Sequence, residues 1–282
     1  MRAESFAFFA AFLKARSGLH LGPEKAYLLE SRLAPVARTA GSASLDDLAL
    51  RLGRTRDPGL ESAVVNAMTT NETSFFRDRA PFDAFRATLL PRLMAARAEA
   101  RRLRFWSAAA STGQEAYSLA MLVAETPGLE GWSVEIVGTD ISGDAIARAK
   151  SGLYSQFEVQ RGLPITRLLR HFTQTGEGWV VSPALRAAVD FRTFNLLGAL
   201  DRLGTFDVIL CRNLLIYLDG PTRADLLTRM RRQLAPDGRI CLGSAEAVTG
   251  LTRAFTSDPD APGWLLPAPA IARAMERRHA LV

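Results

Sequence analysis

Apolar residues near the start of the chain recur with the spacing of an amphipathic helix. Phe6, Phe9 and Leu13 fall at positions i, i+3 and i+7, which puts them on one helix face. Farther on, the run Ser44-Leu-Asp-Asp has the order of a helix start, with Ser44 as the N-cap and an acidic residue three positions later. We therefore expect residues 1–70 to form a small all-α domain.

From residue 103 onward, short apolar runs alternate with helix-like segments. The expected strands are 103–107, 134–138, 206–211 and 238–243, and the expected helices are 114–125, 141–151 and 221–234. Strands that alternate with helices of this length imply βαβ units and a mostly parallel sheet. The pattern therefore predicts an α/β domain over residues 103–268.

One part of this segment breaks the alternation. Residues 171–194 hold three short runs of alternating polarity, and Thr175-Gly-Glu-Gly separates the first two. Such runs around a glycine turn predict an antiparallel hairpin, here as an insertion over about residues 165–193. The rest of the chain divides into a linker, residues 71–102, and a basic C-terminal tail, residues 269–282.

Arginine gives the chain a formal net charge of +6 at pH 7, because the only lysines are Lys14, Lys25 and Lys150. A basic surface attracts nucleic acid, an anionic membrane or an acidic patch on a protein, and composition leaves all three open. Arginine richness can equally reflect codon usage alone.

Composition and spacing exclude several classes of protein. No apolar stretch of roughly 18 residues is present, so no membrane-spanning helix is expected. Glu4 and Lys14 interrupt the apolar run at the start, which favours an amphipathic helix over a signal peptide. Cys211 and Cys241 lie in strand-like apolar runs without metal-ligand spacing. They are therefore expected to be buried thiols, as in a reducing cytoplasm.

A loop of small residues, Ser107-Ala-Ala-Ala-Ser-Thr-Gly, follows the first expected strand. Small side chains let a ligand approach the backbone, and the N-terminus of the next helix is electropositive. The loop lacks the G-x-G-x-x-G pattern of dinucleotide sites. A small zwitterionic ligand is therefore favoured over a pyrophosphate.

Two acidic residues narrow the identity of that ligand. Asp140 ends the second expected strand, where a carboxylate can accept hydrogen bonds from ribose hydroxyls. Glu115 opens the helix after the small-residue loop, where it would repel a phosphate and attract a cation. S-adenosylmethionine has a ribose and a sulfonium but no phosphate, so the two acids favour it over NAD. A simple N-cap or loop role is the alternative for Asp140.

Three longer segments resemble one known family. They are Asn71-Glu-Thr-Ser-Phe-Phe-Arg, Phe105-Trp-Ser-Ala-Ala-Ala-Ser-Thr-Gly-Gln-Glu-Ala-Tyr-Ser and Phe206-Asp-Val-Ile-Leu-Cys-Arg-Asn-Leu-Leu-Ile-Tyr-Leu-Asp. Together they are similar to the bacterial chemotaxis-receptor glutamate methyltransferases of the CheR type. Gln114 and Ala116 replace the family's usual Glu and Pro, whereas Glu115 is retained.

The resemblance implies a fold and a site. The fold would be a class I S-adenosylmethionine-dependent methyltransferase, with a Rossmann-like, mostly parallel sheet, a small all-α N-terminal domain and an inserted antiparallel β-subdomain. Arg77 and Tyr217 are expected to act at the methyl group, with no metal involved. The cofactor-binding residues implied are Asn71, Thr73, Arg77, Glu115, Asp140, Asn195, Leu196, Asn213 and Leu214.

The two expected catalytic residues have plainer interpretations that the sequence leaves open. Arg77 can orient a carboxylate, or it can form a surface ion pair with Asp78 or Glu72. The Tyr217 hydroxyl can direct a carboxylate oxygen, or the ring can simply pack on the sheet.

The resemblance also implies a substrate. Methyl groups would pass to glutamates on the cytoplasmic helices of chemoreceptors, giving glutamyl methyl esters and S-adenosylhomocysteine at receptor arrays in the cytoplasm. A basic N-terminal domain would dock those acidic helices, and neither nucleic acid nor membrane insertion is expected. The alternatives are a methyltransferase for nucleic acid or a small molecule, and a cofactor-binding signalling protein without catalysis.

Some members of this family bind a receptor's C-terminal pentapeptide through the β-subdomain. The hairpin turn here, within Phe172–Trp179, is shorter than in those members. The sequence therefore predicts a methyltransferase that works without a pentapeptide tether.

Overall fold

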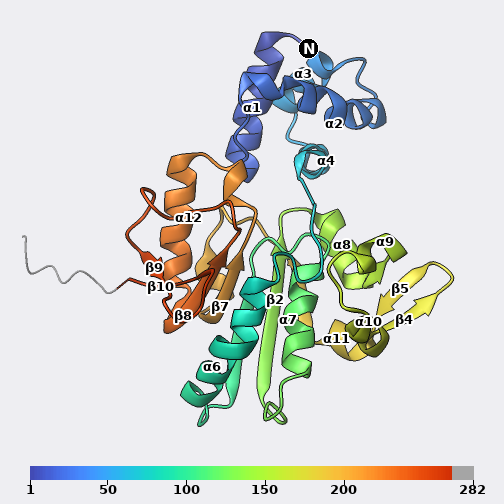
Figure 1. Cartoon of the computed structure of the whole chain (residues 1–282). Helices are drawn as coiled ribbons and strands as arrows, with labels where there is room; N and C mark the ends of the chain where they lie inside the picture. Colours follow the sequence, from blue (N-terminus) through green and yellow to red (C-terminus); the bar gives the residue numbers. More distant parts are fainter. Residues whose placement is uncertain (269–282) are drawn as a thin grey trace, which may run out of the picture.

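The computed structural model describes residues 1–268, which form a helical N-terminal domain joined to an α/β domain (Figure 1). The N-terminal domain holds α1 (Ala3–Ser17), η1 (Pro23–Lys25), α2 (Ala26–Thr39), α3 (Leu45–Arg54) and α4 (Pro58–Met68). Phe9 and Leu13 are buried in its core, as the spacing predicted. Ser44 caps α3 by accepting the backbone N–H of Asp47 at 3.1 Å. The all-α prediction is therefore confirmed.

A short helical segment leads from this domain to the sheet. It consists of α5 (Ala80–Ala84), the π-helical turn η2 (Phe85–Leu89) and α6 (Leu90–Ala96). Phe82, Phe85 and Leu90 are buried against the sheet, so the segment covers one of its faces.

The main sheet has seven strands in the order β6-β2-β1-β7-β8-β10-β9. Their bounds are β1 (Arg102–Ser107), β2 (Ser133–Asp140), β6 (Val189–Thr193), β7 (Phe206–Cys211), β8 (Leu234–Leu242), β9 (Phe255–Ser257) and β10 (Trp264–Pro267). The five strands from β6 to β8 are parallel, whereas β10 runs antiparallel to both β8 and β9. Strand order reverses between β1 and β7, which is where open α/β sheets bind ligands.

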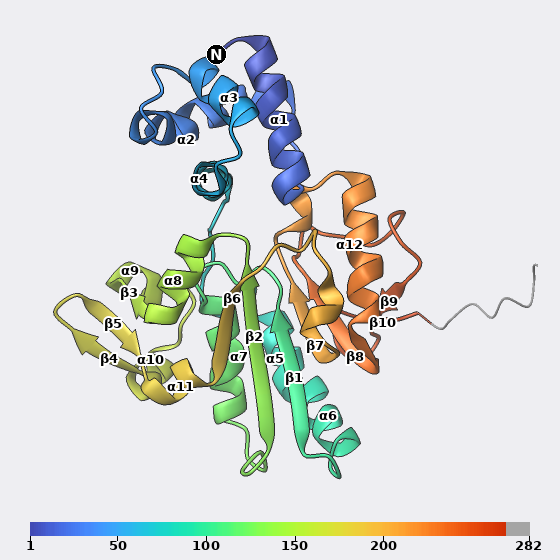
Figure 2. The same cartoon turned by 180° about the vertical axis from the view of Figure 1, so that it is seen from behind.

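Alternating side chains of the central strands enter two separate cores. Phe105 packs with the helices of one face, while the next residue, Trp106, packs with those of the other. The first face is covered by α5, α6 and α7 (Gln114–Ala124), and the second by α12 (Gly220–Arg232), as Figures 1 and 2 show. Helices on both faces explain why the strands read as nearly continuous apolar runs.

The inserted β-subdomain is a three-stranded antiparallel sheet in the order β3-β5-β4. Its strands are β3 (Leu153–Tyr154), β4 (Phe172–Thr175) and β5 (Gly178–Val181). Around it lie α8 (Gly143–Ser151), α9 (Gln156–Gln160), α10 (Ile165–His171) and α11 (Pro183–Ala187). The β4–β5 hairpin was predicted, whereas β3 was not.

One prediction about this insertion is wrong. Residues 189–193 were placed in the antiparallel hairpin, but they form β6, which pairs in parallel with β2 at the edge of the main sheet. Val189 and Phe191 are buried and the residues between and after them are exposed. An edge strand with one covered face has the same alternating pattern as a hairpin strand, so the pattern could not separate the two.

Within residues 1–268, no helix has both the length and the apolar character needed to cross a membrane. Cys211 and Cys241 are buried free thiols, as expected. The predicted basic tail, 269–282, lies outside the described residues.

Candidate cofactor site

A cavity of about 1150 Å³, counting the solvent at its mouth, lies where the N-terminal domain meets the carboxyl ends of β1, β2 and β7. The N-terminal domain supplies one wall through Ser17, Leu19 and the end of α4. The loops after β1, β2, β6 and β7 supply the others. All of the residues predicted for the site line this cavity, namely Asn71, Thr73, Arg77, Glu115, Asp140, Asn195, Leu196, Asn213, Leu214 and Tyr217.

The segment from Asn71 to Arg77, here called the strap, runs along the cavity and turns at residues 75–78. Phe75 and Phe76 anchor it, because both rings are buried and Phe75 meets Tyr154 edge to face at 5.1 Å. The Phe76 N–H donates to the Ser118 hydroxyl at 3.0 Å, which ties the strap to α7. Two buried aromatic anchors therefore direct the next residue, Arg77, into the cavity.

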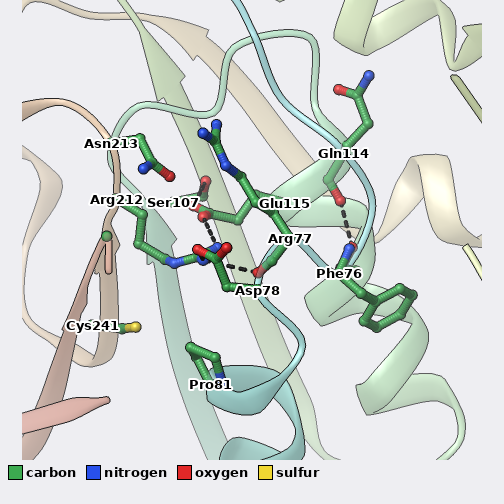
Figure 3. A network of polar contacts seen from close by, with 12 residues as sticks. Phe76, Arg77, Asp78, Pro81, Ser107, Gln114, Glu115, Arg212, Asn213 and Cys241 are labelled. Atoms are coloured by element: carbon green, nitrogen blue, oxygen red, sulfur yellow. Dashed lines mark hydrogen bonds and ion pairs between the residues drawn. The ribbon is translucent and has the colours of Figure 1, made fainter. Parts of the chain in front are cut away.

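Arg77 is not paired with either carboxylate that the sequence offered. Its guanidinium donates to the backbone carbonyl of Glu72 at 3.1 Å. Figure 3 shows it pointing away from Asp78, whose carboxylate instead pairs with Arg212 at 2.7 Å. Among residues 1–268, no carboxylate forms a salt bridge with Arg77.

Arg212 lies beneath the cavity in a buried network with two acids (Figure 3). Its Nη1 donates to Glu115 Oε2 at 3.2 Å, and its Nη2 donates to the Arg77 carbonyl at 2.8 Å as well as to Asp78. The side chain is only 2% exposed, and its Nε has no hydrogen-bond partner within residues 1–268. The network joins the strap, helix α7 and the residue that follows β7.

Glu115 sits in the first turn of α7 and is almost fully buried. Its second carboxylate oxygen, Oε1, accepts the Ser107 hydroxyl at 2.7 Å. Burial raises the pKa of Glu115 above its usual value, although Arg212 and Ser107 act in the opposite direction. Both carboxylate oxygens are thus held by the protein at the edge of the cavity.

Asp140 ends β2, as predicted, and the residue as a whole is 9% exposed. One oxygen accepts the N–H of Ser142 at 2.9 Å and the other accepts the N–H of Ser111 at the same distance. Burial raises the pKa of Asp140, and these two N–H groups partly offset that effect. Each oxygen retains a lone pair that a ligand hydroxyl can use.

The side chain of Asn195 is partly used by hydrogen bonds within the protein. Its Nδ2 donates to the Arg16 carbonyl of α1 at 2.6 Å, and its Oδ1 accepts the Leu197 N–H at 3.0 Å. One amide N–H therefore remains for a ligand. Leu196 beside it gives the cavity an apolar surface.

Asn213 has a left-handed backbone, with φ of 59°, at the point where the chain leaves β7. Glu246 holds this turn, because its Oε2 accepts the N–H groups of Asn213 at 2.8 Å and Gly243 at 2.7 Å. Its Oε1 accepts the Ile216 N–H at 3.3 Å. The 3-10 turn η4 (Leu215–Tyr217) is thus supported from below, with Tyr217 lining the cavity.

Sequence reasoning assigned no role to Arg212 or Glu246. A signal existed for Arg212, since a charged residue follows directly after the apolar run 208–211 of β7. Glu246 ends the segment Gly243-Ser-Ala-Glu, which resembles a Gly-x-Ser-Glu turn of the family, but its partners Asn213 and Ile216 lie some thirty residues away in sequence. Residues 1–268 contain no cluster of three or more His, Cys, Asp or Glu side chains that could hold a metal ion.

Comparison with known proteins identifies the two domains. Residues 4–69 match the family model "CheR methyltransferase, all-alpha domain". Residues 71–261 match the model "CheR methyltransferase, SAM binding domain". The boundary between the two matches falls at the start of the strap.

Named relatives resemble the chain over most of its length. Chemotaxis protein methyltransferase 1 of Pseudomonas aeruginosa is 42% identical over 92% of this chain and 95% of the relative. Chemotaxis protein methyltransferase Cher2 of Pseudomonas putida is 40% identical over the same shares. The chemotaxis protein methyltransferase of Escherichia coli is 36% identical over 86% of this chain and 83% of the relative. The chain therefore belongs to the CheR methyltransferase family and is an S-adenosylmethionine-dependent methyltransferase.

Proposed function

We propose that this methyltransferase esterifies the side-chain carboxylates of glutamates on chemoreceptor cytoplasmic helices. The observation that carries the proposal is Arg77, an arginine without a carboxylate partner among the described residues, in a cavity that Tyr217 also lines. A guanidinium without a carboxylate partner can donate two parallel hydrogen bonds to an incoming carboxylate. Membership of a chemotaxis methyltransferase family supports a receptor glutamate as the residue that carries this carboxylate.

The side chains of the cavity fit S-adenosylmethionine. Asp140 would hold the ribose hydroxyls, and Glu115 would attract the positively charged part of the ligand. Asn195 and Leu196 would contact the adenine end, while Asn71, Thr73, Asn213 and Leu214 complete the walls. When bound, the cofactor supplies an activated methyl group.

The chain's own residues need to position rather than deprotonate the substrate. A glutamate side chain, with a reference pKa of about 4.3, is already ionised at neutral pH. No general base is therefore required beside Arg77 and Tyr217, the two residues expected to act at the methyl group. Arg77 would orient the carboxylate and the Tyr217 hydroxyl would direct one oxygen, so that most of the rate gain comes from alignment.

Docking of the substrate would use the N-terminal domain. The domain forms one wall of the cavity, and the chain as a whole is basic. A basic surface steers an acidic helix toward the cavity mouth. We also propose that the enzyme acts in the cytoplasm at receptor arrays, because the proposed substrate is the cytoplasmic part of the receptor.

Incubation of the purified protein with S-adenosylmethionine and receptor cytoplasmic fragments is expected to give base-labile methyl esters on glutamates. The Asp140→Ala variant should lose both esterification and S-adenosylhomocysteine binding by calorimetry, since a charge-assisted hydrogen bond to ribose contributes roughly 1.5–3 kcal/mol. Methylation of RNA, DNA or a small molecule with no ester on receptor fragments would contradict the proposed substrate. Cofactor binding without any turnover would indicate a non-catalytic signalling protein.

We also propose that the enzyme works without a pentapeptide tether. The β4–β5 hairpin has four-residue strands and turns over only Gly176 and Glu177, which gives an added peptide strand little length to pair with. Titration of receptor C-terminal pentapeptides should therefore show no binding by calorimetry. A Kd in the range of about 1 nM to 10 μM, equivalent to roughly 7–12 kcal/mol, would contradict this proposal.

A further inference from the structure

The residues that directly follow α1 are hydrogen-bonded to the turn that carries Tyr217. The His20 N–H donates to the Tyr217 carbonyl at 2.9 Å, and Leu19 forms a β-bridge with Leu218. Gly18, the C-cap of α1, has a φ of 77° and approaches Leu218 so closely that an added Cβ would lie 3.1 Å from its side chain. The N-terminal domain therefore contacts the residue expected to act at the methyl group.

An ion pair closes the same junction. Lys14 Nζ on α1 lies 2.7 Å from Asp219 Oδ2, two residues beyond Tyr217. Asp219 is also the N-cap of α12, since its Oδ1 accepts the Thr222 N–H at 3.0 Å. Lys14 and then Thr222 hold the pKa of Asp219 well below its ordinary value, as expected for a carboxylate with both oxygens engaged.

The turn that carries Tyr217 is thus held from two sides. Glu246 binds backbone N–H groups before Tyr217, and α1 binds the backbone at and after it. A 3-10 turn of three residues has little internal hydrogen bonding to set its own orientation. Its direction is therefore set by these outside contacts together with the burial of Leu215 and Leu218 in the core.

We propose that Lys14 is a positioning residue for methyl transfer, acting through Asp219 to set the orientation of Tyr217. The contacts of Lys14, Leu19 and His20 with Tyr217, Leu218 and Asp219 are named the α1 latch. The inference rests on the proposed role of Tyr217. It gives the N-terminal domain a second task besides substrate docking, because the domain then tunes the reactive end of the cavity.

The latch predicts a specific kinetic signature. Lys14→Met should lower kcat for receptor methylation about threefold, which is the scale of a partly exposed ion pair, with KM for S-adenosylmethionine little changed. Lys14→Glu, which places two carboxylates together, should lose more, and adding Asp219→Asn should return activity to the level of Lys14→Met. Lys14→Arg should restore kcat, because it keeps the charge.

A matched control separates positioning from general weakening of the domain. Arg2 at the other end of α1 pairs with Asp46 inside the N-terminal domain, at 3.5 Å and with similar exposure to the Lys14–Asp219 pair. Arg2→Met should therefore leave kcat unchanged. High salt should lower the wild-type kcat toward that of Lys14→Met and should have little effect on the variant, because an exposed pair is screened.

Hydrogen exchange gives a readout that does not depend on the reaction. Lys14→Met should speed amide exchange in peptides covering residues 18–22 and 213–222, whereas Arg2→Met should not. Unchanged exchange and unchanged kcat in Lys14→Met and Lys14→Glu would overturn the latch. Equal losses in kcat and cofactor affinity, without rescue by Lys14→Arg, would also overturn it. Absence of receptor methylation by the wild-type protein would refute the proposed function, while the exchange measurement would still decide the latch.

Discussion

Replacing Arg77 by alanine is expected to lower kcat for receptor methylation by about 100- to 1000-fold, the cost of removing a preorganised group at the reacting centre. The side chain is half-buried at the cavity wall, and its only hydrogen bond within residues 1–268 is to the Glu72 carbonyl. Removing it leaves no buried carboxylate without a partner, so the protein should fold normally. Single-turnover kinetics with receptor fragments, with circular dichroism as the fold check, measures this effect.

Two further variants make the result specific. Arg77→Lys keeps the positive charge but loses the planar fork, so it should recover only part of the activity. Arg86, an exposed arginine of η2, serves as the control, and Arg86→Ala should turn over at the wild-type rate. A folded Arg77→Ala protein with wild-type kcat would remove Arg77 from the mechanism.

Replacing Arg212 by methionine should have the largest effect on stability. The variant keeps an unbranched apolar side chain but leaves the buried Glu115 carboxylate without its counter-charge. Breaking a buried ion pair from one side typically costs about 3–5 kcal/mol in the free energy of unfolding. Asp78 loses its partner too, but its side chain is 38% exposed and can be solvated by water. Urea denaturation measures the loss.

The pH dependence tests the cause of that loss. Burial already raises the folded-state pKa of Glu115 above its unfolded value, and removing Arg212 should raise it further. A carboxyl with a raised folded pKa favours folding below its unfolded pKa, and this contribution is lost as pH rises through the folded pKa. The stability difference from wild type should therefore be larger at pH 8 than at pH 5.

A second change should repair the variant. Adding Glu115→Gln to Arg212→Met removes the unpaired charge while keeping an oxygen for the Ser107 hydroxyl, so most of the lost stability should return and its pH dependence should flatten. A double variant as unstable as Arg212→Met at every pH would show that packing around Phe82, whose ring lies 5.6 Å from the Arg212 guanidinium carbon, and not the charge, explains the loss.

The central strands of the sheet and the helices between them could be predicted because their signals are local. The cap at Ser44 and the strand ending at Asp140 depend on residues only a few positions apart, and the structure confirms them. The assignment of residues 189–193 was wrong because an alternating run indicates only that one face of the strand is buried. Whether the partner is a hairpin strand or the parallel strand β2 depends on where the chain returns.

Nearby residues and contiguous motifs were enough to specify the βαβ alternation, the family and ten of the residues that line the cavity. Tertiary structure alone decided the environment of those residues. It paired Arg212 with Glu115 across 97 positions and set Glu246 under the turn at Asn213. It also placed the end of α1 against Tyr217. Such contacts join segments that share no local pattern, and they are selected by packing within the α/β domain for the first two and by packing of the two domains for the third.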